Sequence, residues 1–313
     1  MTRALVFPGQ GSQAIGMGRD VAGAFATARD VFAEIDEALH QNLSRLMFEG
    51  PEDDLTLTEN AQPALMAASL AVARVLEKDG KLDLKSHVAF VAGHSLGEYS
   101  ALAAAHALAL ADAARLLKRR GQAMQRAVPV GMGAMAAMLG AELDLARDVA
   151  KAAAQNEVCD LANDNGGGQL VLSGHKTAIE RAVAIAAERG VRRSIMLPVS
   201  APFHCALMQP AADEMADALG EVKLGEPWVP LIANVCAAPV RDPDEIKRLL
   251  VEQVTGLVRW RECVLAMKEQ GVHELIELGA GKVLTGLTKR IDKELTGQAI
   301  GTPTEIEAFL KTM

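Results

Sequence analysis

The stretch Val88-Ala89-Phe90-Val91-Ala92-Gly93-His94-Ser95-Leu96-Gly97 decides the fold of this chain. Its apolar first half predicts a buried strand, and the alanine-rich residues 98–114 that follow are typical of a packed helix. A strand, a sharp turn and a helix, with serine between two glycines, predict a nucleophile elbow. The glycines let the backbone pass close to Ser95, and the helix N-terminus offers free N–H groups to an oxyanion. A glycine-flanked turn with no catalytic role would show the same motif, so the rest of the sequence has to decide.

A second glycine-rich loop, Pro8-Gly9-Gln10-Gly11-Ser12-Gln13, follows the apolar run Ala4-Leu5-Val6-Phe7. Loops at the carboxyl ends of strands are where α/β sheets bind their substrates. Residues 9–14 loosely fit a dinucleotide fingerprint, but the following segment is helical and no strand ending in a ribose-binding acid comes at the required distance. We therefore expect the amide of Gln10 and the backbone N–H groups of the loop to bind an oxyanion or a carbonyl.

Strands and helices alternate over most of the chain, which predicts a mostly parallel sheet with helices on both faces. Residues 129–200 differ, because their order of strand, helix, two strands, helix and strand is that of a ferredoxin-like unit. We predict an α/β protein with a large α/β-hydrolase-like domain (residues 1–128 and 201–313) and a small ferredoxin-like subdomain (residues 129–200). Outside that subdomain, helices are expected at residues 21–40, 58–78, 101–110, 112–127, 243–255, 260–270 and 282–292.

Composition narrows the functional classes. Half of the 313 residues are apolar, which is enough for a large core, and no stretch reads as a membrane span or a signal peptide. A net charge of −8 argues against a general binder of nucleic acid or anionic membranes. The four cysteines are scattered without metal-site spacing, so free thiols and no metal are expected. A cytoplasmic protein is expected, and a monomer, because no heptad repeat suggests an interface.

Two residues outside the elbow are candidates for chemistry. His204 lies in the loop that leaves the predicted subdomain, at a junction where clefts form, so it is a candidate general base. Arg120 lies in the middle of a predicted helix. It is either an ordinary surface group or a clamp for a substrate carboxylate.

Five separated motifs carry a resemblance over nearly the full length. They are FPGQGSQ from Phe7, GHSLGEYSAL from Gly93, KRRGQAM from Lys118, APFHCALM from Ala201 and GKVLTGLTKR from Gly281. In combination they resemble the malonyl-CoA:acyl carrier protein transacylases of fatty acid synthesis. Residues 279–281 read Gly-Ala-Gly where such proteins often have a central proline, but this departure is remote from the proposed chemistry.

The resemblance implies a serine–histidine dyad without a carboxylate. Ser95 would be the nucleophile and His204 its base, and the backbone carbonyl of Gln253 would orient the histidine. The backbone N–H groups of Gln10 and Leu96 would form the oxyanion hole.

The resemblance also implies how the acyl group is selected. Arg120 would pair bidentately with the free carboxylate of a malonyl group, and Phe203 would narrow the pocket against an α-methyl branch. His94 would adjoin the site without assigned chemistry, and Asn163 would line the cleft from the small subdomain. Together with Gln253, these residues are expected to bind the substrate. The reaction would need no bound cofactor, since malonyl-CoA is the donor and a phosphopantetheine thiol the acceptor.

The implied partner is a holo acyl carrier protein. Such carriers are acidic, so docking is expected on a local basic patch drawn from Arg189, Arg192, Arg193 and Lys289.

Two other classes share some of these features. A serine esterase or thioesterase uses the same elbow, usually with an acid placed between serine and histidine in chain order. A non-catalytic carrier-binding module is disfavoured, because the serine, base, arginine and oxyanion loop are all present.

Overall fold

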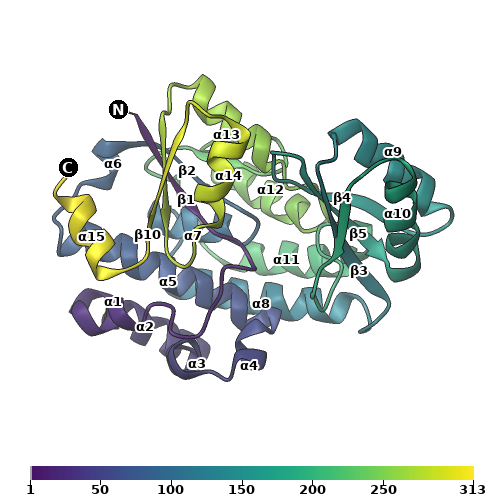
Figure 1. Ribbon diagram of the computed structural model, residues 1–313. Coiled ribbons are helices and arrows are strands. Elements are labelled where there is room, and N and C mark those ends of the chain that lie inside the picture. The colour runs from purple at the N-terminus through teal and green to yellow at the C-terminus, as the bar shows by residue number, and fades with distance from the viewer. Residues whose placement is uncertain (1) are drawn as a thin grey trace.

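A six-stranded sheet with strand order β10-β9-β1-β2-β7-β8 forms the centre of the larger part of the computed structural model, which describes residues 2–313 (Figure 1). Its strands are β1 (Arg3–Phe7), β2 (Val88–Gly93), β7 (Leu231–Ala233), β8 (Ala238–Val240), β9 (Glu274–Leu278) and β10 (Thr296–Ile300). All neighbours pair in parallel except β7 and β8. Phe7 pairs with Gly93, so β1 and β2 end side by side. The predicted mostly parallel sheet is confirmed.

Helices cover both faces of this sheet. They are α1 (Arg19–Ala24), α2 (Ala26–Leu39), α3 (Leu43–Glu49), α4 (Glu52–Thr56), α5 (Thr58–Lys78), α6 (Leu84–His87), α7 (Gly97–Ala104), α8 (Leu110–Ala127), α11 (Gln209–Glu221), α12 (Pro243–Thr255), α13 (Trp260–Glu269), α14 (Val283–Ile291) and α15 (Pro303–Leu310), with a short 3₁₀ turn at Ala206–Met208. Side chains alternate along β1: Leu5 and Phe7 enter the core shared with α5, α7 and α8, whereas Ala4 and Val6 face α13 and α14. Burying a large apolar side chain stabilises the fold by about 1.5–3 kcal/mol, so this strand anchors both layers.

The small sheet is antiparallel, with strand order β4-β5-β3-β6. Its elements are β3 (Gly133–Leu139), α9 (Leu143–Ala154), β4 (Cys159–Asp164), β5 (Gln169–His175), α10 (Lys176–Glu188) and β6 (Arg193–Met196). The two helices pack on one face around their own core. Met135 and Val171 on the other face join the main core. This order confirms the ferredoxin-like unit, and the division at residues 129 and 200 stays a prediction.

The hairpin between β4 and β5 attaches the small sheet to the larger part. The backbone of Asp164 donates to the carbonyl of Val258 at 3.0 Å, and Val258 donates to Ala162 at 2.9 Å. Arg261 pairs with the buried Asp164 carboxylate at 2.8 Å. The end of β4 is therefore held against the start of α13, beside the elbow.

Two predicted helices differ from the structure. The helix expected at residues 21–40 is divided at Phe25, which is extended (φ −124°, ψ 127°) and packs its ring on the main core. The helix expected at residues 101–110 ends at Ala104, because His106 adopts a left-handed conformation. The N–H of Ala107 then returns to the carbonyl of Leu102 at 2.9 Å, which satisfies the helix end.

Three global features bear on function. Within residues 2–313, no helix combines the length and apolarity that a membrane crossing requires. The same residues contain no cluster of three or more His, Cys, Asp or Glu placed to hold a metal ion. All four cysteines are free thiols.

Candidate active site

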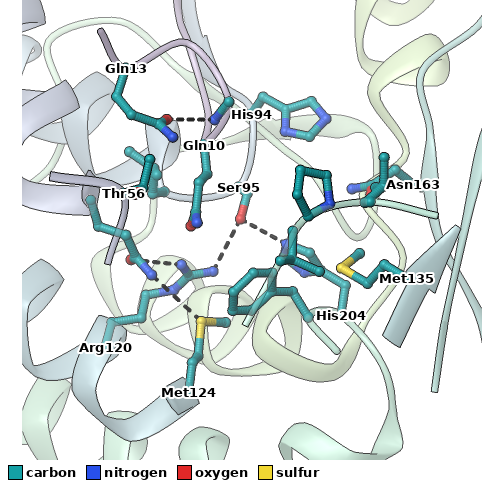
Figure 2. A pocket seen from close by; sticks show the side chains of 17 residues that line it. Gln10, Gln13, Thr56, His94, Ser95, Arg120, Met124, Met135, Asn163 and His204 are labelled. Atoms are coloured by element: carbon teal, nitrogen blue, oxygen red, sulfur yellow. Dashed lines mark hydrogen bonds between the residues drawn. The ribbon is translucent and has the colours of Figure 1, made fainter. Parts of the chain in front are cut away.

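The elbow predicted at Ser95 lies between β2 and α7. Ser95 has a φ of 54°, a left-handed conformation that costs a non-glycine residue of order 1–3 kcal/mol and clusters at functional sites. A Cβ on Gly93 would lie 1.8 Å from the carbonyl carbon of Gly97, and a Cβ on Gly97 would lie 2.3 Å from the carbonyl oxygen of Phe7. The close passage of β1, β2 and α7 therefore requires both glycines. The turn presents the Ser95 hydroxyl to a cavity (Figure 2).

His204 lies beside Ser95 and forms a dyad with it. The Ser95 hydroxyl donates to His204 Nε2 at 2.7 Å, and His204 Nδ1–H donates to the backbone carbonyl of Gln253 in α12 at 2.8 Å. The carbonyl fixes the proton on Nδ1 and leaves Nε2 as the acceptor. Within residues 2–313, no carboxylate is hydrogen-bonded to this ring. The carbonyl thus takes the place that an aspartate has in a triad.

The surroundings of His204 keep it neutral. Burial, and then the positive charge of Arg120, lowers the pKa of His204 from 6.5 to about 3. A neutral imidazole is the form that accepts a proton from a nucleophile, so the ring is available as a base throughout the physiological pH range.

Two residues that line the same cavity have backbone N–H groups without an acceptor in the described chain. Leu96 is the first residue after the nucleophile, at the N-terminus of α7, and Gln10 lies in the loop after β1. The loop is held by a bond from Gln10 Nε2 to Thr58 at 3.3 Å, and the backbone of His94 donates to Phe7 at 3.0 Å. In the described chain, the backbone N–H groups of Gln10 and Leu96 donate to no other residue. Both are therefore free to bind an oxyanion.

Arg120 extends from α8 into the site and is 1% exposed. Its guanidinium donates to Gln62 Oε1 at 2.8 Å, to Gln253 Oε1 at 2.9 Å and to Ser95 Oγ at 3.2 Å. Its Nε has no partner in the described chain, and burial lowers the pKa of Arg120. All three acceptors are neutral. A buried cation bound only to neutral groups gains most from an anionic ligand.

Gln253 lies behind the dyad and does not line the cavity. It is fully buried, and its Nε2 donates to the Ser95 carbonyl at 3.0 Å and to Glu98 Oε2 at 2.5 Å. Burial raises the pKa of Glu98 to about 8, against the opposing hydrogen bonds from Asn234 and Gln253 and the charge of Arg120. The predicted substrate-binding residue is thus placed to support Arg120 and His204.

The cavity has a volume of about 350 Å³, and residues of the larger part and of the small sheet line it. Eight of the nine predicted site residues line it: Gln10, His94, Ser95, Leu96, Arg120, Asn163, Phe203 and His204. The side chains of Met124, Met135 and Val199 form part of its apolar lining. The site is therefore a mostly apolar pocket in which one guanidinium supplies the charge.

His94 joins the elbow to the small sheet. Its Nε2 lies 2.9 Å from Asn165 Oδ1, and its ring lies 5.8 Å from that of Trp260. Burial lowers the pKa of His94, so the neutral ring acts as a hydrogen-bonding link. Asn163, at the end of β4, lines the cavity from the small sheet.

Comparison with known proteins fits this geometry. Residues 4–299 match the family model described as the acyl transferase domain. This chain belongs to the acyl transferase family. The malonyl CoA-acyl carrier protein transacylases of Escherichia coli K12 and Bacillus subtilis 168 are 44% and 42% identical to it over 308 and 311 residues. The matches cover 98% of both chains for the first, and 99% of this chain and 96% of the relative for the second.

Solved structures show the same architecture. The acyl-carrier-protein S-malonyltransferase of Bartonella henselae is 54% identical, with a TM-score of 0.97 over 100% of this chain and 99% of that one. A complex of a type II PKS acyl-carrier protein with its malonyl-transacylase is 41% identical, with a TM-score of 0.96 over 100% of both chains. The fold of this acyl transferase is therefore that of the solved transferases.

Three polar residues of the acyl transferase site were not predicted from the sequence. Gln62 accepts a hydrogen bond from Arg120, and Asn234 Oδ1 accepts from the Ser95 N–H at 2.8 Å. Glu98 accepts from both Gln253 and the backbone of Asn234. Only Glu98 carried a signal that could have been used, because it is the one charged residue of α7 and lies three residues after the nucleophile.

Proposed function

We propose that the protein is an S-malonyltransferase, which moves malonyl from malonyl-CoA to the phosphopantetheine thiol of a holo acyl carrier protein. The observation that carries this proposal is the position of Arg120, whose guanidinium lies 3.2 Å from Ser95 Oγ and has only neutral partners. An acyl group on Ser95 that ends in a carboxylate would neutralise this cation, whereas an acetyl group would leave it unpaired.

The first half-reaction forms a malonyl ester on Ser95. His204 Nε2 takes the hydroxyl proton as Oγ attacks the thioester carbon, and the N–H groups of Gln10 and Leu96 hold the resulting oxyanion. When the carbon–sulfur bond breaks, the imidazolium returns the proton to the CoA thiolate. The enzyme then holds a malonyl–serine ester and a neutral His204.

The second half-reaction reverses these roles with a new thiol. His204 takes the proton of the phosphopantetheine thiol while the sulfur of that thiol attacks the ester carbon. Ser95 Oγ then leaves and receives the proton from His204. The mostly apolar pocket favours the thiol over water as the attacking group. The names of the related transacylases, and the related complex with a carrier protein, support this acceptor.

A basic patch suits an acidic carrier. Arg189, Arg192 and Arg193 are exposed beside β6, and Lys289 is exposed in the last turn of α14. None of the four forms an ion pair within residues 2–313. Unpaired surface cations steer an anionic partner and raise its association rate.

Contacts near the hairpin support treating these residues as one patch. Arg193 pairs in register with Leu139, and Gly140 donates to the carbonyl of Gly168 at 2.8 Å. A Cβ on the adjacent Gly167 would lie 2.7 Å from Arg290, the neighbour of Lys289. Arg193 therefore lies near the hairpin whose Asn165 contacts the elbow, and Lys289 is next in sequence to a residue that contacts it.

The docking proposal is tested by reversing two charges, Arg193→Glu and Lys289→Glu together. The KM for holo carrier protein should rise roughly tenfold, and the rate of Ser95 malonylation by malonyl-CoA should not change. An unchanged KM for the carrier would refute the patch.

Transfer is distinguished from hydrolysis by its products. Malonyl-CoA is incubated with the enzyme with and without holo carrier protein, and malonyl-carrier, free malonate and CoA are quantified, with Ser95→Ala as the control. We expect malonyl-carrier as the main product and little malonate. Free malonate released at the turnover rate without carrier would instead identify a hydrolase.

The remaining features follow from this assignment as proposals. Serine, histidine, arginine and backbone N–H groups supply every step, so we propose that no resident cofactor is needed. We further propose that the enzyme acts as a monomer in the cytoplasm, since one chain supplies the whole site.

A further inference from the structure

Glu98 has no role in the reaction as described, although it lies beneath the site. It sits in the first turn of α7 and is 1% exposed. Both carboxylate oxygens accept hydrogen bonds from N–H donors: Oε1 from the backbone of Asn234 at 2.6 Å, and Oε2 from Gln253 Nε2 at 2.5 Å. The network therefore fits the ionised carboxylate, which accepts and does not donate.

This arrangement determines which way the Gln253 amide points. An amide has one donor end and one acceptor end. Since Nε2 donates to Glu98 and to the Ser95 carbonyl, the other end of the amide, Oε1, is directed at Arg120, which donates to it at 2.9 Å. If the amide were reversed, its NH₂ group would face the guanidinium, and two donors would meet.

Glu98 also holds Asn234, whose side chain supports the backbone of the elbow. It fixes the backbone of Asn234, whose side chain accepts from the Ser95 N–H at 2.8 Å and donates to the carbonyl of Gly93 at 2.7 Å. Loss of this support would affect every acyl substrate equally, because it acts on the nucleophile. Loss of the Gln253 orientation would in addition release Arg120, and this part of the effect falls only on substrates that use its guanidinium.

We propose that Glu98 is a positioning residue that locks the Gln253 amide, holds Arg120 toward the acyl site and so contributes to selectivity for acyl groups with a free carboxylate. This inference rests on the proposed malonyl transfer. Glu98 itself does not line the cavity. Its effect therefore passes through Gln253.

The test is Glu98→Gln, a change of nearly equal size that places an NH₂ group in the network. The backbone N–H of Asn234 needs the remaining oxygen, so the new NH₂ faces Gln253 Nε2 and two donors meet. Reversing the Gln253 amide would turn its oxygen toward the Ser95 carbonyl, so neither orientation satisfies the network and the amide is no longer fixed toward Arg120. We expect kcat/KM for malonyl-CoA to fall roughly tenfold to a hundredfold, and that for acetyl-CoA to change less than about threefold. Both substrates are measured at pH 8.5, where the wild-type carboxylate is the main form.

Glu277→Gln is the matched control. Glu277 is a second buried glutamate, 1% exposed, whose two oxygens accept from the backbones of Leu284 and Thr285 at 3.1 and 2.7 Å. This substitution makes the same donor–donor conflict at the start of α14, outside the cavity lining. It should lower the melting temperature without changing the ratio of malonyl to acetyl kcat/KM.

Each outcome decides the inference. A ratio unchanged in Glu98→Gln would refute the positioning role, and a raised ratio would mean that Glu98 mainly neutralises Arg120. If that variant does not fold, Gln253→Ala carries the test, because it removes the same acceptor from Arg120 and must lower the ratio. A wild-type enzyme with no preference for malonyl-CoA would refute the proposed function itself, whatever the variants do.

Discussion

Replacing Arg120 with methionine should convert a malonyl-selective enzyme into one with little selectivity. Methionine keeps much of the side-chain length and removes the charge. It leaves the amide oxygens of Gln62 and Gln253 without their donor, and this cost is the same for every substrate. The change in selectivity therefore reports only the contact between the guanidinium and the substrate carboxylate.

The magnitude follows from the burial of the site. Arg120 is 1% exposed, so its pair with a malonyl carboxylate would be shielded from water. Removing one partner of a buried, hydrogen-bonded pair costs about 3–5 kcal/mol. Since about 1.4 kcal/mol corresponds to a factor of ten, kcat/KM for malonyl-CoA should fall roughly 10²- to 4 × 10³-fold. The kcat/KM for acetyl-CoA should fall much less, because its acyl group makes no ion pair with Arg120 and only the cost common to all substrates remains.

The assay measures kcat/KM for malonyl-CoA and acetyl-CoA with the same carrier protein. Melting temperature serves as the folding control. A malonyl-to-acetyl ratio that changes less than about threefold would refute the role of Arg120, even if both rates fell.

Three further predictions concern the scaffold. Gly93→Ala should destabilise the fold by more than about 3 kcal/mol, because its Cβ would lie 1.8 Å from Gly97; a denaturation midpoint close to wild type would contradict this. Asp164→Asn breaks the ion pair with Arg261, so it should lower the melting temperature by several degrees and leave the ratio of malonyl to acetyl kcat/KM unchanged. A changed ratio would contradict a purely structural role of this pair. The pKa of His204 is lowered to about 3, so the unfolded chain binds a proton between pH 6.5 and 3 that the folded chain does not, and the free energy of unfolding falls as the pH is lowered through that window. The His204→Gln variant should lose less free energy of unfolding per pH unit there; a loss equal to that of the wild type would contradict this prediction.

The alternation of strands and helices could be predicted because local pattern determines it. The helices expected at residues 58–78 and 243–255 have these bounds in the structure, since each has a clear apolar face and a clear end. The β10 strand, Thr296–Ile300, was not predicted, because it is a half-buried edge strand with little apolar alternation. The helix after the elbow was predicted too long, because its end depends on the left-handed backbone of His106.

The site was predictable only in part, for a different reason. Ser95 is identified by its own neighbours in the sequence, whereas the role of Arg120 came from a resemblance, since a lone arginine in a helix carries no local signal. Glu98 and Gln253 are 155 positions apart, and their contact depends on how α7 and α12 pack. Patterns within one element do not predict such pairs.

The central claim is that Ser95 carries the malonyl group during transfer. The direct measurement is the intact mass of the protein after mixing with malonyl-CoA, compared with the Ser95→Ala variant, before and after addition of holo carrier protein. We expect one malonyl adduct on the wild type, none on the variant, and complete loss of the adduct to the carrier. An adduct on Ser95→Ala, or transfer of malonyl to the carrier by that variant, would contradict the account.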